Sequence, residues 1–220
     1  MLRVAIDGPG GTGKSTIAKA VASRLGLEYI DTGAMYRSIA LKSIRLTVDP
    51  EDEKSVVDML SDTVIDFDDN KVYLDGEDVS GLIRTNEISM QASTISKLGP
   101  VRAKVDEVSK RLAATKNVVM EGRDIGTAVI PDAEVKIFMT ADPVVRAKRR
   151  YDQLIEQGKS ANLEEIKDEI EKRDYQDSHR EINPLKQAED AVFLDTSEMS
   201  IEENIDAVCD IIAAKTGSEA

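Results

Sequence analysis

Residues 2–15 of this chain of 220 residues read LRVAIDGPGGTGKS, an apolar run that leads into a glycine-rich segment. The run Leu2–Ile6 predicts a buried strand. Residues Lys14–Leu25 predict a helix, because apolar side chains recur at steps of four and Gly26 follows as a C-terminal cap. The glycine-rich segment therefore joins a strand to a helix.

This segment matches the phosphate loop of nucleoside triphosphate-binding proteins. Glycines let consecutive backbone N–H groups turn inward around phosphate oxygens at the positive end of a helix. Lys14 is expected to reach the β- and γ-phosphates and to act in catalysis, and the Ser15 hydroxyl is expected to bind the Mg²⁺ that accompanies ATP. The residues expected to bind ATP are Gly8, Pro9, Gly10, Gly11, Thr12, Gly13, Lys14, Ser15 and Thr16.

Regulatory GTPases and motor ATPases share this loop, so the loop alone does not define a kinase. Guanine-specific proteins normally carry an Asn-Lys-x-Asp stretch. Here the nearest match, Asn70-Lys71-Val72-Tyr73, lacks the acidic residue and lies in a predicted hairpin turn. A switch protein is therefore the weaker interpretation.

Strands and helices are expected to alternate along most of the chain, which is typical of parallel βαβ units. Further buried strands are predicted at 27–30, 118–120, 135–139 and 192–194, and a capping box at 200–203 begins the last helix. Between about residues 45 and 85 the pattern changes to short alternating runs around a turn at 68–71, which predicts an antiparallel insertion. Two amphipathic helices should follow, separated by Gly99-Pro100.

Composition narrows the class of protein. The formal net charge of −13 argues against a nucleic-acid binder, which needs a basic surface. No apolar run approaches the roughly 18 residues of a membrane span, and the N-terminus runs directly into structured sequence. Cys209 is the only cysteine and is expected to pack in the core of a protein from a reducing compartment. We expect a cytoplasmic protein, acting as a monomer without a membrane or nucleic-acid partner.

Two segments place arginines at the ligand-binding edge of the predicted sheet. Thr32 follows the second strand and could cap the next helix, from whose first turns Arg37 would emerge. Arg123 and Asp124 follow the strand at 118–120. Arginine suits bidentate phosphate binding, and a carboxylate can accept hydrogen bonds from an amine or a hydroxyl. The alternatives are a surface role for Arg37 and a mutual ion pair between Arg123 and Asp124.

A helical stripe changes from apolar to charged residues without changing face. The spacing 3-4-3-4-3 aligns Leu163, Ile166, Ile170, Arg173, Asp177 and Arg180. We interpret this stripe as a core-packing helix that runs into a polar cavity; an exposed, salt-bridged helix end is the alternative.

Basic residues are most concentrated on the helix opened by Asp142-Pro143. Its arginines, Arg146, Arg149 and Arg150, could form a mobile lid that neutralises a transferring phosphoryl group. The alternative is a solvated helix face.

The order of these motifs resembles the nucleoside monophosphate kinase family of P-loop kinases, and within it the bacterial cytidylate kinases. The motifs that carry the resemblance are residues 8–16, 31–37, 121–127 and 173–180, and the resemblance covers nearly the whole chain. It implies a three-layer α/β/α core at 1–36 and 100–220 around a parallel sheet, an antiparallel monophosphate-binding insertion at 37–99, and a helical lid at about 146–162.

The resemblance also implies an activity, the transfer of the γ-phosphoryl group of ATP to CMP or dCMP with Mg²⁺. Where the family often has Ser, this chain has Thr32, which keeps the hydroxyl. Arg123, Arg149 and Arg150 would be catalytic along with Lys14. The residues that would bind CMP are Thr32, Arg37, Ser93, Arg102, Arg123, Asp124, Arg173, Asp177 and Arg180.

Two rival functions stay open from the residues alone. One is a P-loop kinase that acts on UMP, dTMP, AMP or a non-nucleotide acid. The other is a regulatory nucleotide-binding protein without an acceptor, which would hydrolyse ATP or GTP slowly and ignore every added monophosphate.

Overall fold

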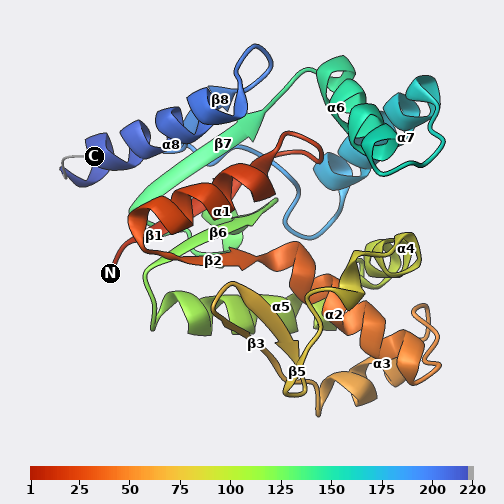
Figure 1. Ribbon diagram of the computed structural model, residues 1–220. Helices are drawn as coiled ribbons and strands as arrows, with labels where there is room; N and C mark the ends of the chain where they lie inside the picture. Colours follow the sequence, from red (N-terminus) through yellow and green to blue (C-terminus); the bar gives the residue numbers. More distant parts are fainter. Residues whose placement is uncertain (218–220) are drawn as a thin grey trace. The chain divides into compact units, whose positions relative to one another are not determined.

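The structure is a computed structural model that describes residues 1–217 (Figure 1). Its chain divides into two compact units, one of residues 28–118 with Met1 and one of residues 2–27 with the chain from 119 onward. The second unit contains the phosphate loop. Among the described residues, no helix is both long and apolar enough to cross a membrane.

The main sheet has five strands in the order β2-β6-β1-β7-β8. Parallel pairing joins β1 to β7, with Ile6 opposite Ile137, and β7 to β8, with Phe138 opposite Phe193. Every residue of β6 is buried, as expected for a central strand covered on both faces. The strands are β1 (Arg3–Asp7), β2 (Glu28–Asp31), β6 (Val118–Gly122), β7 (Val135–Thr140) and β8 (Val192–Asp195). The predicted parallel α/β class is confirmed.

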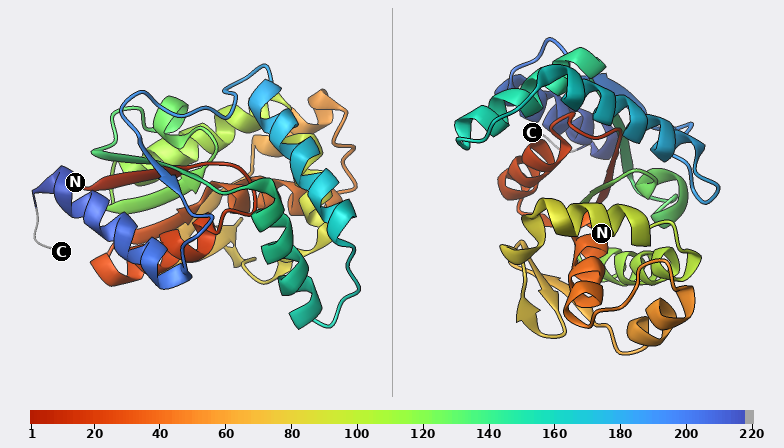
Figure 2. Two further views of the ribbon diagram at one scale, coloured as in Figure 1. Left: turned by 90° about the horizontal axis from the view of Figure 1, so that it is seen from above. Right: turned by 90° about the vertical axis from the view of Figure 1, so that its right-hand side faces the viewer.

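Two pairs of helices belong to the unit with the phosphate loop. Helices α1 (Lys14–Leu25) and α8 (Ile201–Thr216) pack against each other (Figure 1). The α1 helix ends at Gly26 in the left-handed conformation, and α8 begins with the predicted capping box of Ser200 and Glu203. Helices α6 (Pro143–Glu156) and α7 (Leu163–His179) form a second packed pair (Figure 2).

The unit of residues 28–118 combines helices with a small antiparallel sheet in the order β3-β4-β5. Phe67 lies opposite Val72 across the predicted hairpin, which is confirmed. Helix α2 packs against α4 and α5. The elements are α2 (Thr32–Arg45), α3 (Glu53–Leu60), β3 (Ile65–Asp68), β4 (Lys71–Leu74), β5 (Glu77–Asp78), η1 (Leu82–Arg84), α4 (Asn86–Ile95) and α5 (Gly99–Ala113).

Two local details differ from the sequence-based expectations. Thr32 does not cap α2, because it is the first residue of the helix, and Asp31 accepts the hydrogen bond from the backbone N–H of Ala34. Aspartate is as good a cap as threonine, so the shift by one residue costs the helix nothing. Gly99 and Pro100 were expected to separate α4 from α5, but they belong to the first turn of α5, where proline lacks only an N–H that the helix would leave unused, and residues 96–98 lie between the two helices.

Candidate active site

The phosphate loop follows β1 directly and requires glycine at its first position. Gly8 has φ of 149°, and a Cβ atom there would lie 1.9 Å from the carbonyl oxygen of Met139, so a side chain cannot be accommodated. Gly13, with φ of 91°, caps the N-terminus of α1 without a side chain. The first turn of α1 therefore presents its backbone N–H groups and its positive dipole end at the loop.

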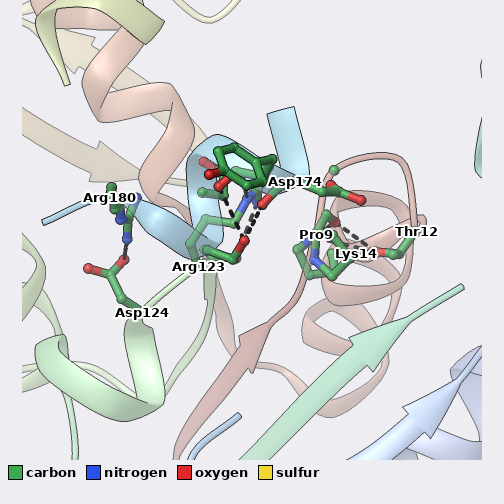
Figure 3. Close-up of polar contacts among 12 residues, drawn as sticks. Pro9, Thr12, Lys14, Arg123, Asp124, Asp174 and Arg180 are labelled. Atoms are coloured by element: carbon green, nitrogen blue, oxygen red, sulfur yellow. Dashed lines mark hydrogen bonds and ion pairs between the residues drawn. The ribbon is translucent and has the colours of Figure 1, made fainter. Parts of the chain in front are cut away.

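Lys14 is buried, and its ammonium group lies inside the loop (Figure 3). Its Nζ atom donates to the carbonyl of Pro9 at 2.6 Å and to the hydroxyl of Thr12 at 3.3 Å. Burial lowers the pKa of Lys14 below its ordinary value, and the positive charge of Arg123 lowers it further. The carboxylates of Glu121 and Asp7 oppose this decrease, and an anion bound beside Lys14 would favour its charged form further.

Arg123, at the carboxyl end of β6, lies against the phosphate loop and pairs with α7. Its Nε atom donates to Oδ2 of Asp177 at 2.8 Å. Its Nη2 atom lies 3.5 Å from the position that a Cβ atom at Gly10 would take. The guanidinium group is therefore held by a carboxylate on one side and directed at the loop on the other.

Asp124, the next residue, pairs with Arg180 just beyond the end of α7 (Figure 3). The distance from its Oδ1 atom to Nη2 of Arg180 is 3.1 Å, and Nε of Arg180 donates to the carbonyl of Asn183 at 2.7 Å. The expected alternative of a pair between Arg123 and Asp124 is therefore not the arrangement seen. Each residue pairs with α7 or its end instead, so two arginine–aspartate pairs join the same two segments.

The stripe predicted on α7 explains this arrangement. Ile166 is buried, and Arg173 and Asp177 follow on the same face. The prediction that Arg180 continues this face is wrong, because α7 ends at His179 and Arg180 lies just beyond it in an extended conformation. The Cδ atom of Arg173 lies 3.9 Å from the position of a Cβ atom at Gly10. The stripe thus runs from packed residues to charged residues beside the phosphate loop.

The three arginines predicted to form a lid differ in their contacts. Arg146 is buried and donates to the carbonyl of Gly10 at 2.9 Å, while two of its nitrogens bond Asp174 on α7. Arg149 donates to the carbonyl of Thr196 at 2.6 Å and to that of Thr12 at 3.5 Å. Arg146 and Arg149 therefore bind the phosphate loop itself.

Arg150 lies on the exposed face of α6, where it donates to Gln153 at 2.7 Å. This position matches the solvated face that the sequence left open as an alternative. A catalytic role for Arg150 stays a prediction.

The remaining candidates belong to the unit of residues 28–118. Arg37 donates to Asp31 at 2.6 Å, so one carboxylate both caps α2 and holds this arginine. Arg102 is buried, with its guanidinium carbon 5.9 Å from the centre of the Tyr36 ring. Ser93 and Thr32 differ in exposure, since Ser93 is exposed and Thr32 is buried. Within this unit, Arg37 lies in the first turns of α2, and Arg102, on α5, lies beside Tyr36 of that helix.

Sequence reasoning missed three residues that contact this site. Asp174 lies beside the recognised stripe and pairs with Arg146. Thr196, fully buried after β8, bonds Arg149 and also donates to the carbonyl of Thr12 at 3.4 Å. Asp7 ends β1 and accepts two backbone hydrogen bonds from residues after Asp124. Only Asp7 left a signal, a carboxylate at the end of an apolar strand and next to the loop.

The family to which these residues belong follows from comparison with known proteins. The family model described as cytidylate kinase matches residues 4–214. The chain belongs to the cytidylate kinase family. It is therefore an enzyme, a nucleoside monophosphate kinase, and the resemblance drawn from its motifs is confirmed.

Curated cytidylate kinases match over nearly their full length. That of Lactobacillus johnsonii is 48% identical over 219 residues, which is 98% of this chain and 95% of the relative. That of Chlorobaculum tepidum is also 48% identical, over 95% of this chain and 92% of the relative. A solved shikimate kinase from Bacteroides thetaiotaomicron shares the fold, with a TM-score of 0.51, 14% identity and coverage of 96% of this chain and 98% of its own.

Proposed function

We propose that this enzyme transfers the γ-phosphoryl group of ATP to CMP or dCMP, giving ADP and CDP or dCDP. The observation that carries the proposal is the position of Arg123, which is held by Asp177 and directed at Gly10 of the phosphate loop. Arg123 supplies a cation at the loop that can bind a second phosphate, and the next residue, Asp124, pairs with a further arginine, Arg180. The name of the matching family and of its relatives supports cytidine as the base.

The reaction needs positioning and charge neutralisation more than a base. The acceptor phosphate is already an oxyanion, so it can attack the γ-phosphorus in line when both anions are held together. Lys14 would exchange its hydrogen bonds with Pro9 and Thr12 for phosphate oxygens. Arg123 would stabilise charge on the phosphoryl group as it moves, because it lies against Gly10.

The Mg²⁺ that accompanies ATP fits the residues present. Ser15 follows Lys14 in the first turn of α1 and is exposed, so its hydroxyl can reach a metal held by phosphate oxygens. When bound, Mg²⁺ would neutralise phosphate charge. The loop and Lys14 would orient the triphosphate, while Arg146 and Arg149 hold the loop through its carbonyls.

Roles for the acceptor side follow from the family resemblance. Arg37, Arg123 and Arg180 would bind the CMP phosphate, with Thr32 supplying a hydroxyl. Ser93, Arg102 and Asp124 would contact cytosine, and Arg173 with Asp177 would hold the ribose. The assignment of residues 37–99 to acceptor binding, and of 146–162 to a lid, belongs to the same proposal. We further propose a monomer in the cytoplasm; the free, buried Cys209 supports the reducing compartment.

A panel of acceptors tests the substrate. ATP consumption should be measured by a coupled assay with CMP, dCMP, UMP, dTMP, AMP and no acceptor. We expect the highest kcat/KM with CMP or dCMP. Preference for another monophosphate would refute the cytidine assignment, and slow hydrolysis that ignores every acceptor would support a regulatory protein instead.

A further inference from the structure

Asp7 is a buried carboxylate without a part in the mechanism above. It is the last residue of β1, it directly precedes Gly8 of the phosphate loop, and it is 5% exposed. A buried carboxylate is costly unless hydrogen bonds or charges stabilise it. Its contacts therefore indicate what it does.

Both oxygens of Asp7 accept backbone hydrogen bonds from one turn of chain. Oδ1 accepts from the N–H of Ile125 at 2.8 Å, and Oδ2 accepts from the N–H of Gly126 at 2.7 Å. These donors begin the turn η2 (Ile125–Val129) that follows Arg123 and Asp124. With both oxygens engaged, the carboxylate serves as an anchor for this turn.

The turn is in van der Waals contact with the carboxylate and lies still closer to the side chain of Lys136. A Cβ atom at Gly126 would lie 3.4 Å from Oδ2 of Asp7 and 3.2 Å from Cδ of Lys136. The carbonyl of Asp124 accepts from the N–H groups of Ala128 and Val129 in the same turn. Asp124 is therefore fixed by a turn that is itself bonded to the end of β1.

The charge state of Asp7 is consistent with its two hydrogen bonds from Ile125 and Gly126. Burial raises the pKa of Asp7 to about 6, and the N–H groups of Gly126 and Ile125 oppose this rise. The negative charge of Asp124 raises the pKa further, whereas the positive charge of Lys14 lowers it. Above about pH 7 the carboxylate is ionised, the form that accepts both hydrogen bonds.

We propose that Asp7 is a positioning residue that sets the placement of Arg123 and Asp124 relative to the phosphate loop. One carboxylate lies one residue from Gly8 and bonds the residues directly after Asp124. A change at Asp7 therefore moves the acceptor residues relative to the loop that holds ATP. This inference rests on the proposed function, in which the loop binds ATP and Asp124 contacts the acceptor.

The test is the kinetics of Asp7→Asn, which keeps the size of the side chain and turns an NH₂ group toward one backbone N–H. Because the loop residues stay in place and the acceptor residues move, we expect KM for CMP to rise about tenfold and kcat to fall, while KM for ATP changes less than twofold. Gly126→Ala adds a methyl group that would contact both Oδ2 of Asp7 and the side chain of Lys136. It should give the same split, and it carries the test if Asp7→Asn does not fold.

The matched control is Ser200→Ala, which removes another side chain that accepts from a helix backbone N–H, in α8. It should lower Tm without changing either KM. A loss of Tm alone in Asp7→Asn and Gly126→Ala, or equal changes in both KM values, would overturn the proposal. If the wild-type enzyme prefers another monophosphate, the cytidine assignment fails, and the changes in KM for that acceptor and in KM for ATP are compared instead. If the wild-type enzyme phosphorylates no monophosphate, both proposals are overturned.

Discussion

The two ends of strand β1 carry arginine–carboxylate clusters of opposite character. At the amino end, the guanidinium group of Arg3 bonds Asp132 at 2.9 Å and Glu134 at 2.7 and 3.1 Å. It also bonds the carbonyl of Asp132, so Nε, Nη1 and Nη2 all donate. Here one cation meets two anions. At the carboxyl end, Lys14, Arg123 and Arg173 gather around the phosphate loop, where cations raise one another's energy.

The pKa values express this difference. Hydrogen bonds from Arg3 lower the pKa of Glu134 to about 2, because its charge is well compensated. Burial lowers the pKa of Lys14 and the charge of Arg123 lowers it further, whereas Glu121 and Asp7 oppose this decrease. Arg3 is bonded to two carboxylates, which stabilise the fold, whereas Lys14 is bonded to a carbonyl and a hydroxyl, which it can exchange for phosphate oxygens. We therefore assign structure to the amino end and phosphate binding to the carboxyl end.

The largest effect should come from Lys14→Ala, which removes the charge at the bridge between the β- and γ-phosphates. We expect kcat for phosphoryl transfer to fall by about a thousandfold, while the protein stays folded. The measurement is the steady-state rate with saturating ATP and CMP. Turnover near the wild-type rate would remove Lys14 from the reaction.

A smaller effect is expected for Asp124→Asn, which keeps the shape of the side chain but loses its charge. The ratio of kcat/KM for CMP over UMP should fall about tenfold, because an uncharged amide oxygen accepts more weakly from the cytosine amine and the new NH₂ group can donate to the uracil carbonyl. Lys14→Ala should leave this ratio unchanged and serves as the control. An unchanged ratio in Asp124→Asn would exclude it from base recognition.

The smallest effect should come from Arg3→Met at the other end of the strand. Exposed ion pairs contribute little, so we expect Tm to fall by about 2 °C at neutral pH and kcat and both KM values to be unaffected. A kinetic defect in this variant would contradict the division between the two ends.

The decrease in Tm caused by Arg3→Met should depend on pH, because Arg3 is bonded to the titratable carboxyl group of Glu134. Its pKa in the folded protein, about 2, lies below the ordinary value of 4.5, so its stabilising contribution is present above about pH 4.5 and is lost as the pH falls toward 2. The Tm difference between wild type and Arg3→Met should therefore shrink from about pH 5 to about pH 2.5. A difference that stays constant would show that Arg3 stabilises by packing alone.

Local features were predictable from the sequence because local physics determines them. The phosphate loop, the Gly26 cap and the capping box of Ser200 each follow from residues within a few positions of one another. The cap of α2 was misplaced by one residue, since Asp31 and Thr32 are both good caps and only the backbone decides between them.

The ion-pair partners of Arg123 and Asp124 were not predictable from the sequence. Arg123 and Asp124 are adjacent, and nothing in their order indicates that each pairs with a residue more than fifty positions away. The stripe did predict that Arg173 and Asp177 share a face of α7, but it extended the helix to Arg180, which follows the last helical residue. Which partners Asp177 and Arg180 would meet depends on how α7 lies beside the phosphate loop, which is a property of the packed unit.

The most direct test of the difference between phosphate-binding and structural arginines is calorimetric titration of CMP, without ATP, into the wild-type protein, Arg180→Met and Arg3→Met. Loss of a charged hydrogen bond to phosphate should raise Kd at least tenfold in Arg180→Met, and Arg3→Met should bind within twofold of wild type. Equal affinities in all three proteins, or weaker binding in Arg3→Met alone, would contradict the assignment of Arg180 to phosphate binding and of Arg3 to structure.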